Sequence, residues 1–166
     1  MDVSIREATA EDVKRIRDVH LRSIEELSGQ AYDETQVEAW AHDRDPEEYP
    51  IDADETHVLV AEADGVVGFG WLREGARQHL RAAVEGELVA VYVHPSIARR
   101  GIGSRLCDAL EAEADSRGLG SLGLWASLSA VPFYEDRSYD RVTAHAHEYR
   151  DGVELTVIEM RKPLSR

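Results

Sequence analysis

Apolar residues recur along the chain with two different periods. A period of two predicts strands at residues 3–7, 56–63, 66–73, 87–93, 122–125, 141–149 and 153–160. A period of three to four predicts helices at residues 9–27, 33–40, 102–118 and 130–136. The polar stretches between them, residues 42–55 and 74–84, are typical of loops.

Short polar signals mark the ends of these elements. Thr9, followed by two acidic residues, is a typical helix start, and Asp33 with Gln36 forms the pattern of a capping box. The Asp-Gly dipeptides at 64–65 and 151–152 predict tight hairpin turns. The order of elements, β-α-α-β-β-β-α-β-α-β-β, predicts an α/β fold with a mixed sheet and helices on both faces.

The composition fits one soluble domain. With 166 residues, of which 43% are apolar, the chain is long enough to bury a core. It contains no apolar run of the about 20 residues that span a bilayer, and its N-terminus lacks the pattern of a signal peptide. Cys107 is the single cysteine and cannot form an intrachain disulfide. We expect one domain over residues 1–166, located in the cytoplasm.

The charge balance is strongly acidic. Asp and Glu number 33 against 19 Lys and Arg, which gives a net charge of −14. A field of this sign argues against nucleic acid or an anionic membrane as a partner. It can favour cationic amine substrates, but an acidic surface poor in lysine also resembles proteins of halophilic archaea, and we prefer that second interpretation.

Residues 91–104 have the composition of a phosphate-binding loop. A β-branched strand leads into a short loop with Gly101 and Gly103, and a helix follows. Glycines let backbone amides approach an anion, and the first turn of a helix presents unpaired N–H groups. Arg99 and Arg100 add positive charge. A tight strand-to-helix turn would use the same glycines for geometry alone, so this loop does not decide the function by itself.

This segment resembles motif A of the GCN5-related N-acetyltransferases, usually Gln/Arg-x-x-Gly-x-Gly/Ala after a strand and a proline. Residues 126–139 resemble their motif B, commonly Asn-x-x-Ala-x-x-Phe-Tyr-x-x-x-Gly-Phe. Both motifs fall at the family's spacing, and the order of elements matches along nearly the whole chain. The match has four departures from the family pattern, at Ala98, Ser129, Ser138 and Tyr139. Ser129 replaces an Asn that binds the cofactor, and its hydroxyl has a shorter reach.

The resemblance implies the acyl-CoA N-acyltransferase fold and transfer of an acetyl group from acetyl-CoA to an amine by direct attack, with no metal. The pantetheine arm would lie along the backbone of Val91, Tyr92 and Val93. The remaining cofactor contacts would come from Arg99, Arg100, Gly101, Ile102, Gly103, Ser104, Ser129 and Phe133. The acceptor is a small molecule or a protein, and relatives are often homodimers. The alternative is a non-catalytic acyl-CoA-binding module on the same fold.

The attacking amine must first lose a proton, because an alkylammonium has a pKa of about 10. Glu87 matches the catalytic glutamate of the family's histone acetyltransferases. Strand alternation would place it on one face with Val89, Val91 and Val93, and these apolar neighbours would raise its pKa. The alternative for Glu87 is a solvated residue at a strand end. His79 is a second, weaker candidate for the base.

Tyr134 matches the family tyrosine that points at the thioester sulfur, and it is our candidate for the acid. The alternative is that it only walls the pantetheine channel. We expect Cys107 to serve packing, and His145 with His147 to form a surface pair rather than a metal site. The helix at 33–40 borders the acceptor pocket in relatives, so Tyr32 and Trp40 either line that pocket or belong to the core.

Overall fold

The computed structural model describes residues 2–26, 32–41, 55–75, 79–97, 100–148 and 152–164. Its helices are α1 (Val13–Glu25), α2 (Glu34–Ala41), α3 (Ile102–Ser116) and α4 (Val131–Asp136). Its strands are β1 (Ser4–Glu7), β2 (Thr56–Glu62), β3 (Val66–Glu74), β4 (Gly86–Val93), β5 (Ser121–Ser127), β6 (Asp140–Glu148) and β7 (Glu154–Pro163). The order of strands and helices along the chain is the order that the apolar periods predict.

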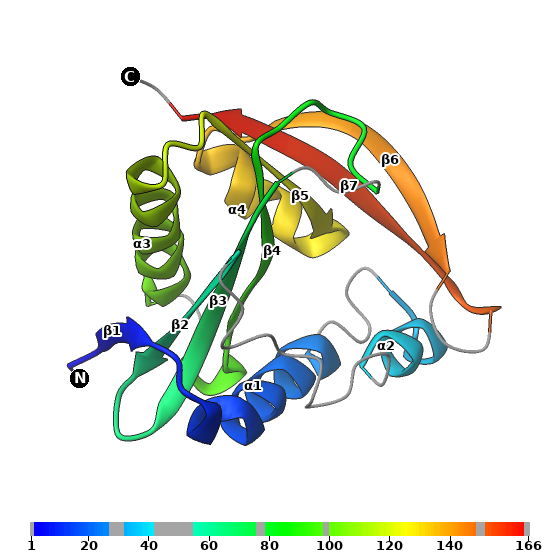
Figure 1. The fold of residues 1–166 in the computed structure, drawn as a ribbon. Helices are drawn as coiled ribbons and strands as arrows, with labels where there is room; N and C mark the ends of the chain where they lie inside the picture. The colour runs from blue at the N-terminus through cyan, green and yellow to red at the C-terminus, as the bar shows by residue number, and fades with distance from the viewer. Residues whose placement is uncertain are drawn as a thin grey trace.

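The strands form one sheet in the order β1-β2-β3-β4-β5-β7-β6. Every neighbouring pair is antiparallel except β4 and β5, which are parallel. β4 and β5 pair only at Gly86 with Leu122 and at Glu87 with Gly123, and beyond these residues the two strands diverge (Figure 1). The side of β4 that faces β5 therefore has backbone groups that β5 does not pair.

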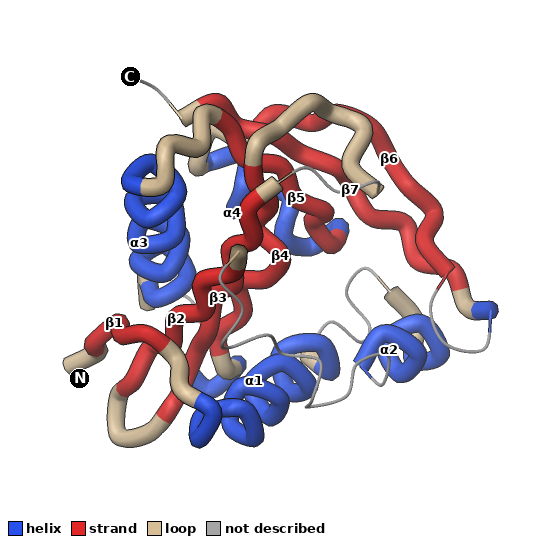
Figure 2. The backbone as a smooth tube through the Cα atoms, in the orientation of Figure 1, coloured by secondary structure: helices blue, strands red, loops and turns tan. Residues whose placement is uncertain are grey.

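Helices cover both faces of the sheet, as the element order predicts. α1 packs Ile16 and Val19 against Phe69 of β3 on one face, whereas α3 packs Leu106 and Leu110 against the other (Figure 1). α2 lies beside the far end of the long β6–β7 hairpin, where Val37 and Leu155 share a small core (Figure 2). Among the described helices, none is long and apolar enough to cross a membrane.

The predicted caps and turns are present where the structure describes them. Asp33 and Gln36 form a reciprocal capping box, with Gln36 N donating to Asp33 Oδ1 at 2.8 Å and Asp33 N to Gln36 Oε1 at 3.0 Å. Asp64 and Gly65 adopt φ angles of +59° and +110°, which is the backbone that an Asp-Gly hairpin turn needs. Gly118, at φ +78°, ends α3. Leu27, residues 42–54 and Asp151 lie outside the described residues.

β4 contains a bulge that the alternation did not predict. Trp71 pairs with Ala90 and the next residue of β3 pairs with Leu88, so Val89 is an extra residue in β4. As a result Val91 and Val93 pack with the core under α3, while Val89 and Tyr92 pack on the α1 face. The expectation that Glu87, Val89, Val91 and Val93 share one face is therefore wrong for the last two residues.

Candidate active site

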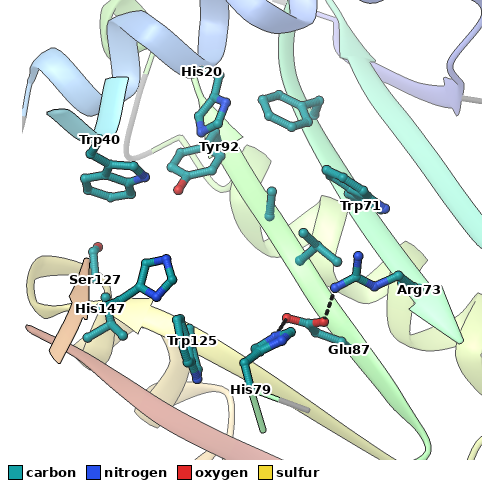
Figure 3. Close-up of a pocket in the computed structure, with 14 residues that line it drawn as sticks. His20, Trp40, Trp71, Arg73, His79, Glu87, Tyr92, Trp125, Ser127 and His147 are labelled. Atoms are coloured by element: carbon teal, nitrogen blue, oxygen red, sulfur yellow. Dashed lines mark hydrogen bonds and ion pairs between the residues drawn. The ribbon is translucent and has the colours of Figure 1, made fainter. Parts of the chain in front are cut away.

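A cavity of about 290 Å³ opens on the α1 face of the sheet, beside the point where β4 and β5 diverge (Figure 3). Strands β3, β4, β5, β6 and β7, helices α1 and α2, and the loop before β4 each contribute lining residues. Its polar and charged lining residues are His20, Arg73, His79, Glu87, Ser127 and His147. Glu87, the predicted base, thus lies in the wall of a cavity and is not a solvated residue at a strand end.

Glu87 is 4% exposed, and both of its carboxylate oxygens have partners. Arg73 Nη2 donates to Oε1 at 2.6 Å, and His79 Nε2 lies 2.7 Å from Oε2 (Figure 3). Burial by itself would raise the pKa of Glu87, but the hydrogen bonds from His79 and Arg73 outweigh burial and the pKa is lowered. The expectation of a raised pKa was wrong because the sequence does not reveal these two partners.

The sheet positions this triad of Glu87, Arg73 and His79. Arg73 is the direct neighbour of Glu87 across the antiparallel β3–β4 pair. On its other side Glu87 pairs with Gly123, the last β5 residue paired with β4 before the strands diverge. His79 reaches Glu87 from the loop between β3 and β4, so the weaker of the two base candidates is a direct neighbour of the stronger one.

A second buried carboxylate, Glu159, holds that loop in place. Glu159 has no exposed surface, and it accepts the backbone N–H groups of Arg81 at 2.9 Å and Ala82 at 2.8 Å. Its Oε1 also lies 2.7 Å from His145 Nε2. Burial acts to raise the pKa of Glu159, but the hydrogen bonds prevail and lower it. His145 is therefore bound to a buried carboxylate, which corrects the expectation of a surface pair.

Sequence reasoning missed Glu159, although the alternation contained a signal. Leu155, Val157 and Glu159 follow one another at every second residue of β7, and all three are buried. A charged residue in register with apolar ones on a buried face needs partners, and such a residue is a candidate for a structural or functional role. The other histidine of the expected surface pair, His147, lines the cavity.

The glycine loop begins α3 as predicted. Gly101 is the N-cap, with φ +80° and no side-chain cap, so it leaves the first N–H groups of the helix available. A Cβ on Gly103 would lie 3.6 Å from the Phe133 ring and 3.8 Å from Val93 Cγ2. Three of the proposed cofactor residues, Gly103, Phe133 and Val93, are thus neighbours. Arg100 is exposed, and Arg99 and Ala98 lie outside the described residues.

Tyr134 is buried in α4, with its ring 5.1 Å from Phe133 and 5.5 Å from Tyr139. Burial raises the pKa of Tyr134 well above its usual value, with a smaller contribution from Cys107. Tyr134 is not among the residues that line the cavity. Ser129 is exposed, and its hydroxyl lies 3.5 Å from that of Ser127.

Of the remaining candidates, Trp40 belongs to the cavity, and Tyr32 and Cys107 belong to the core. Trp40 lines the cavity, whereas the Tyr32 hydroxyl is used inside the core, donating to Thr156 O at 2.7 Å and accepting from Leu128 N at 3.0 Å. Cys107 is fully buried in the core under α3, and burial raises the pKa of its thiol to about 12. Cys107 thus serves packing, as expected. No cluster of metal-binding side chains occurs among the residues that the structure describes.

Known proteins share this architecture. A GCN5-related N-acetyltransferase from Rhodopseudomonas palustris is 28% identical, with a TM-score of 0.84 over 98% of this chain and 96% of that one. The PaiA N-acetyltransferase of Thermoplasma acidophilum, solved with coenzyme A, is 20% identical, with a TM-score of 0.74 over 98% and 99% of the chains. A ribosomal-protein-alanine N-acetyltransferase from Brucella melitensis is 21% identical, with a TM-score of 0.70 over 96% and 99%.

Of two comparisons made at the level of sequence, one finds a match. A comparison with curated proteins finds no match. The model of the acetyltransferase (GNAT) family matches residues 21–139, which include both motifs, the bulged strand and Glu87. Together with the diverging strands and the glycine-capped helix, this match shows that the chain belongs to the GNAT family of acetyltransferases.

Proposed function

We propose that this protein is an N-acetyltransferase that takes acetyl-CoA as donor and transfers the acetyl group to a primary amine within a ternary complex. The observation that carries this proposal is the divergence of β4 from β5. It leaves a row of backbone hydrogen-bonding groups between the glycine-capped end of α3 and the cavity that holds Glu87. An elongated thioester can lie along that row while the amine enters from the cavity.

The residues around the divergence fit this donor. The backbone of Val91, Tyr92 and Val93 would pair with the pantetheine arm. The first turn of α3, from Gly101 through Ser104, would accept the pyrophosphate on its N–H groups, with Arg99 and Arg100 adding charge. Phe133 and Ser129 would complete the contacts. A Cβ on Gly103 would contact Phe133 and Val93 at ordinary distances, so a longer side chain there would extend towards the proposed donor.

Glu87 and His79 would handle the proton of the amine as a pair. With both oxygens bound and its pKa lowered, Glu87 by itself is a weak base. Its carboxylate, however, lies 2.7 Å from His79 Nε2 and orients the imidazole, whose other nitrogen would take the proton of the amine. A histidine that a carboxylate orients in this way can serve as the general base.

Tyr134 would donate the proton to the departing thiolate. Its raised pKa keeps the hydroxyl protonated throughout the neutral range. A coenzyme A thiol has a pKa of about 8.5, so a positioned donor helps expel it without being obligatory.

The competing function is a non-catalytic acyl-CoA-binding module. Release of free coenzyme A from acetyl-CoA, followed with a thiol reagent across a panel of amines at high salt, tests the two functions directly. Amine-dependent release supports the transferase, and calorimetric binding without release by any amine supports the module. Gly103→Glu provides the control, because it should abolish both binding and release.

A further inference from the structure

We infer that the acceptor of this site is a primary amine carried on a flat aromatic ring, which the cavity holds between two aromatic walls. The inference rests on the proposed function and names the substrate class of the same site. It starts from one fact about the chain: all of its three tryptophans, Trp40, Trp71 and Trp125, line this one cavity. Phe69 and Tyr92 line it as well.

The rings form two walls that face each other (Figure 3). The helix-side wall consists of His20, Trp40 and Tyr92, with ring centroids 4.6 Å apart for His20 and Tyr92 and 6.4 Å apart for Trp40 and Tyr92. The sheet-side wall consists of His79, Trp125 and His147, with centroids 4.9 Å and 5.0 Å from that of Trp125. The rings around Trp125 stand edge-to-face, at interplanar angles of 78° and 66°, so aromatic faces and edges both border the cavity and favour an aromatic ligand.

The sheet-side wall has further contacts through His145, a ring that does not line the cavity. His145 lies against Trp125 with a centroid distance of 4.9 Å and an interplanar angle of 32°, and Glu159 binds the other edge of His145. Trp125 therefore packs on His145 in addition to His79 and His147. A preorganised wall of this kind lowers the entropy that a ligand loses when it binds.

The charges in the cavity argue against a polycation. Among the described lining residues the charged side chains are Arg73 and Glu87, and these two neutralise each other across 2.6 Å. The described part of the lining therefore carries no excess of negative charge. An aliphatic polyamine would need free carboxylates for its distal ammonium groups, and both oxygens of Glu87 are already bound.

The size of the cavity agrees with a small acceptor. Its volume of about 290 Å³ lies at the lower end of ligand pockets, which span roughly 300–1,000 Å³. One or two fused rings with a short amine arm fit that volume. The arm would reach the β4 edge near Tyr92, where the thioester is proposed to lie.

A matched pair of amines tests the inference. 2-Phenylethylamine and 2-cyclohexylethylamine share a carbon skeleton and a primary amine, and they differ in the flatness and π face of the ring. We expect kcat/KM to favour the phenyl compound by about tenfold, since each of the two walls contributes one aromatic contact. Equal rates, or faster acetylation of the cyclohexyl amine, 1,4-diaminobutane or a peptide N-terminus, would overturn the inference and leave the proposed function intact.

Two substitutions of Trp40 test whether the helix-side wall causes the preference for the phenyl compound. Trp40→Leu removes one ring of the helix-side wall and keeps apolar volume, while Trp40→Phe keeps a ring. We expect Trp40→Leu to reduce the phenyl preference several-fold with little change for the cyclohexyl amine, and Trp40→Phe to retain most of that preference. An unchanged preference in Trp40→Leu contradicts the role of this wall.

A binding measurement separates this inference from the proposed function. Because every tryptophan lines the cavity, tryptophan fluorescence reports its occupancy without any reaction. Titration with 2-phenylethanol in the presence of coenzyme A should give a saturable change, at about tenfold lower concentration than with 2-cyclohexylethanol. If no amine is acetylated but this difference appears, the proposed function fails and the aromatic site stands. If the two alcohols behave alike, the aromatic site is wrong.

Discussion

Nε2 of His145 lies 2.7 Å from Oε1 of Glu159, a carboxylate that has no exposed surface. The two oxygens of Glu159 also receive the backbone N–H groups of Arg81 and Ala82. One side chain in β7 thus joins strand β6 to the loop that carries His79. Because His79 contacts Glu87, Glu159 is a positioning residue for the proposed proton acceptor.

Replacing Glu159 by Gln should destabilise the fold and loosen that loop. The amide brings its own donors towards two N–H groups and removes a charge-assisted bond, so we expect a loss of about 2 kcal/mol in the free energy of unfolding. Faster hydrogen exchange of residues 79–84 and a lower kcat/KM should accompany it. Glu154→Gln, an exposed change in the same strand, serves as the control and should change stability by less than about 0.5 kcal/mol.

The same variant predicts the direction of an acid effect. The pKa of Glu159 is lowered in the folded chain, so its contribution to stability is present above its unfolded pKa, about 4.3, and is lost as pH falls through the lower folded value. Urea unfolding between pH 7 and pH 3 should therefore show a smaller acid loss in Glu159→Gln than in the natural chain. Identical acid profiles would show that this carboxylate is not linked to folding.

Glu87→Gln should lower turnover by roughly 100-fold or more at neutral pH, because it removes the carboxylate that orients His79 and takes part in the proposed proton transfer. The loss should shrink as pH rises and free amine accumulates. Steady-state rates from pH 6 to pH 10 measure this. Since the pKa of Glu87 is lowered, its own protonation should not limit the rate in that range. A small, pH-independent loss would assign Glu87 a structural role.

Tyr134→Phe tests the acid, because it removes the hydroxyl and keeps the ring that packs between Phe133 and Tyr139. We expect kcat to fall tenfold or more, on the order of one proton-transfer contribution, with acetyl-CoA affinity nearly unchanged. With its pKa raised, the natural hydroxyl should give no alkaline decline in rate up to pH 10. A fall in affinity at constant kcat would make Tyr134 a binding residue.

The two glycines of the α3 loop should respond differently to substitution. Gly103 lacks a positive φ, and a Cβ there meets Phe133 and Val93 at ordinary contact distances, so Gly103→Glu should fold yet fail to bind acetyl-CoA in calorimetry. Gly101 has open space around it but a φ of +80°, so Gly101→Ala should cost about 1 kcal/mol of stability from backbone strain. Unchanged affinity in Gly103→Glu would remove the phosphate-loop interpretation.

Salt should stabilise this protein strongly if its acidic surface is an adaptation to high ionic strength. A net charge of −14 repels itself at low salt, and mobile ions screen that repulsion. We expect Tm to rise from dilute buffer to molar KCl. A salt-independent melting curve would count against the halophilic interpretation and favour the attraction of cationic substrates.

The sequence predicted the elements and their order because apolar periods and turn dipeptides are local signals. It also placed the glycine loop and Tyr134, through motifs whose residues stand close together in the chain. The sequence could not predict the contacts of Glu87 with Arg73 and His79, because these depend on the pairing of β3 with β4 and on the path of a loop.

The bulge at Val89 shows the same limit more sharply. One additional residue in a strand turns every later side chain to the other face, and no local pattern in residues 87–93 reveals it. The aromatic walls could not be predicted from the sequence either, because their residues lie far apart in the chain. Trp40 and Trp125 lie 85 positions apart in the chain, and the fold alone brings them to one cavity.

The two residue pairs that join β4 to β5 are a short backbone link between two parts of the sheet, strands β1–β4 and strands β5–β7. The core under α3, to which Leu72 of β3 and Leu124 of β5 both belong, holds these two parts together. A donor bound along the gap, as proposed, would connect them and add RT ln(1 + [L]/Kd) to stability, about 2.7 kcal/mol at 100 times Kd. The supply of donor would then govern the lifetime of this protein against proteolysis as well as its rate of turnover.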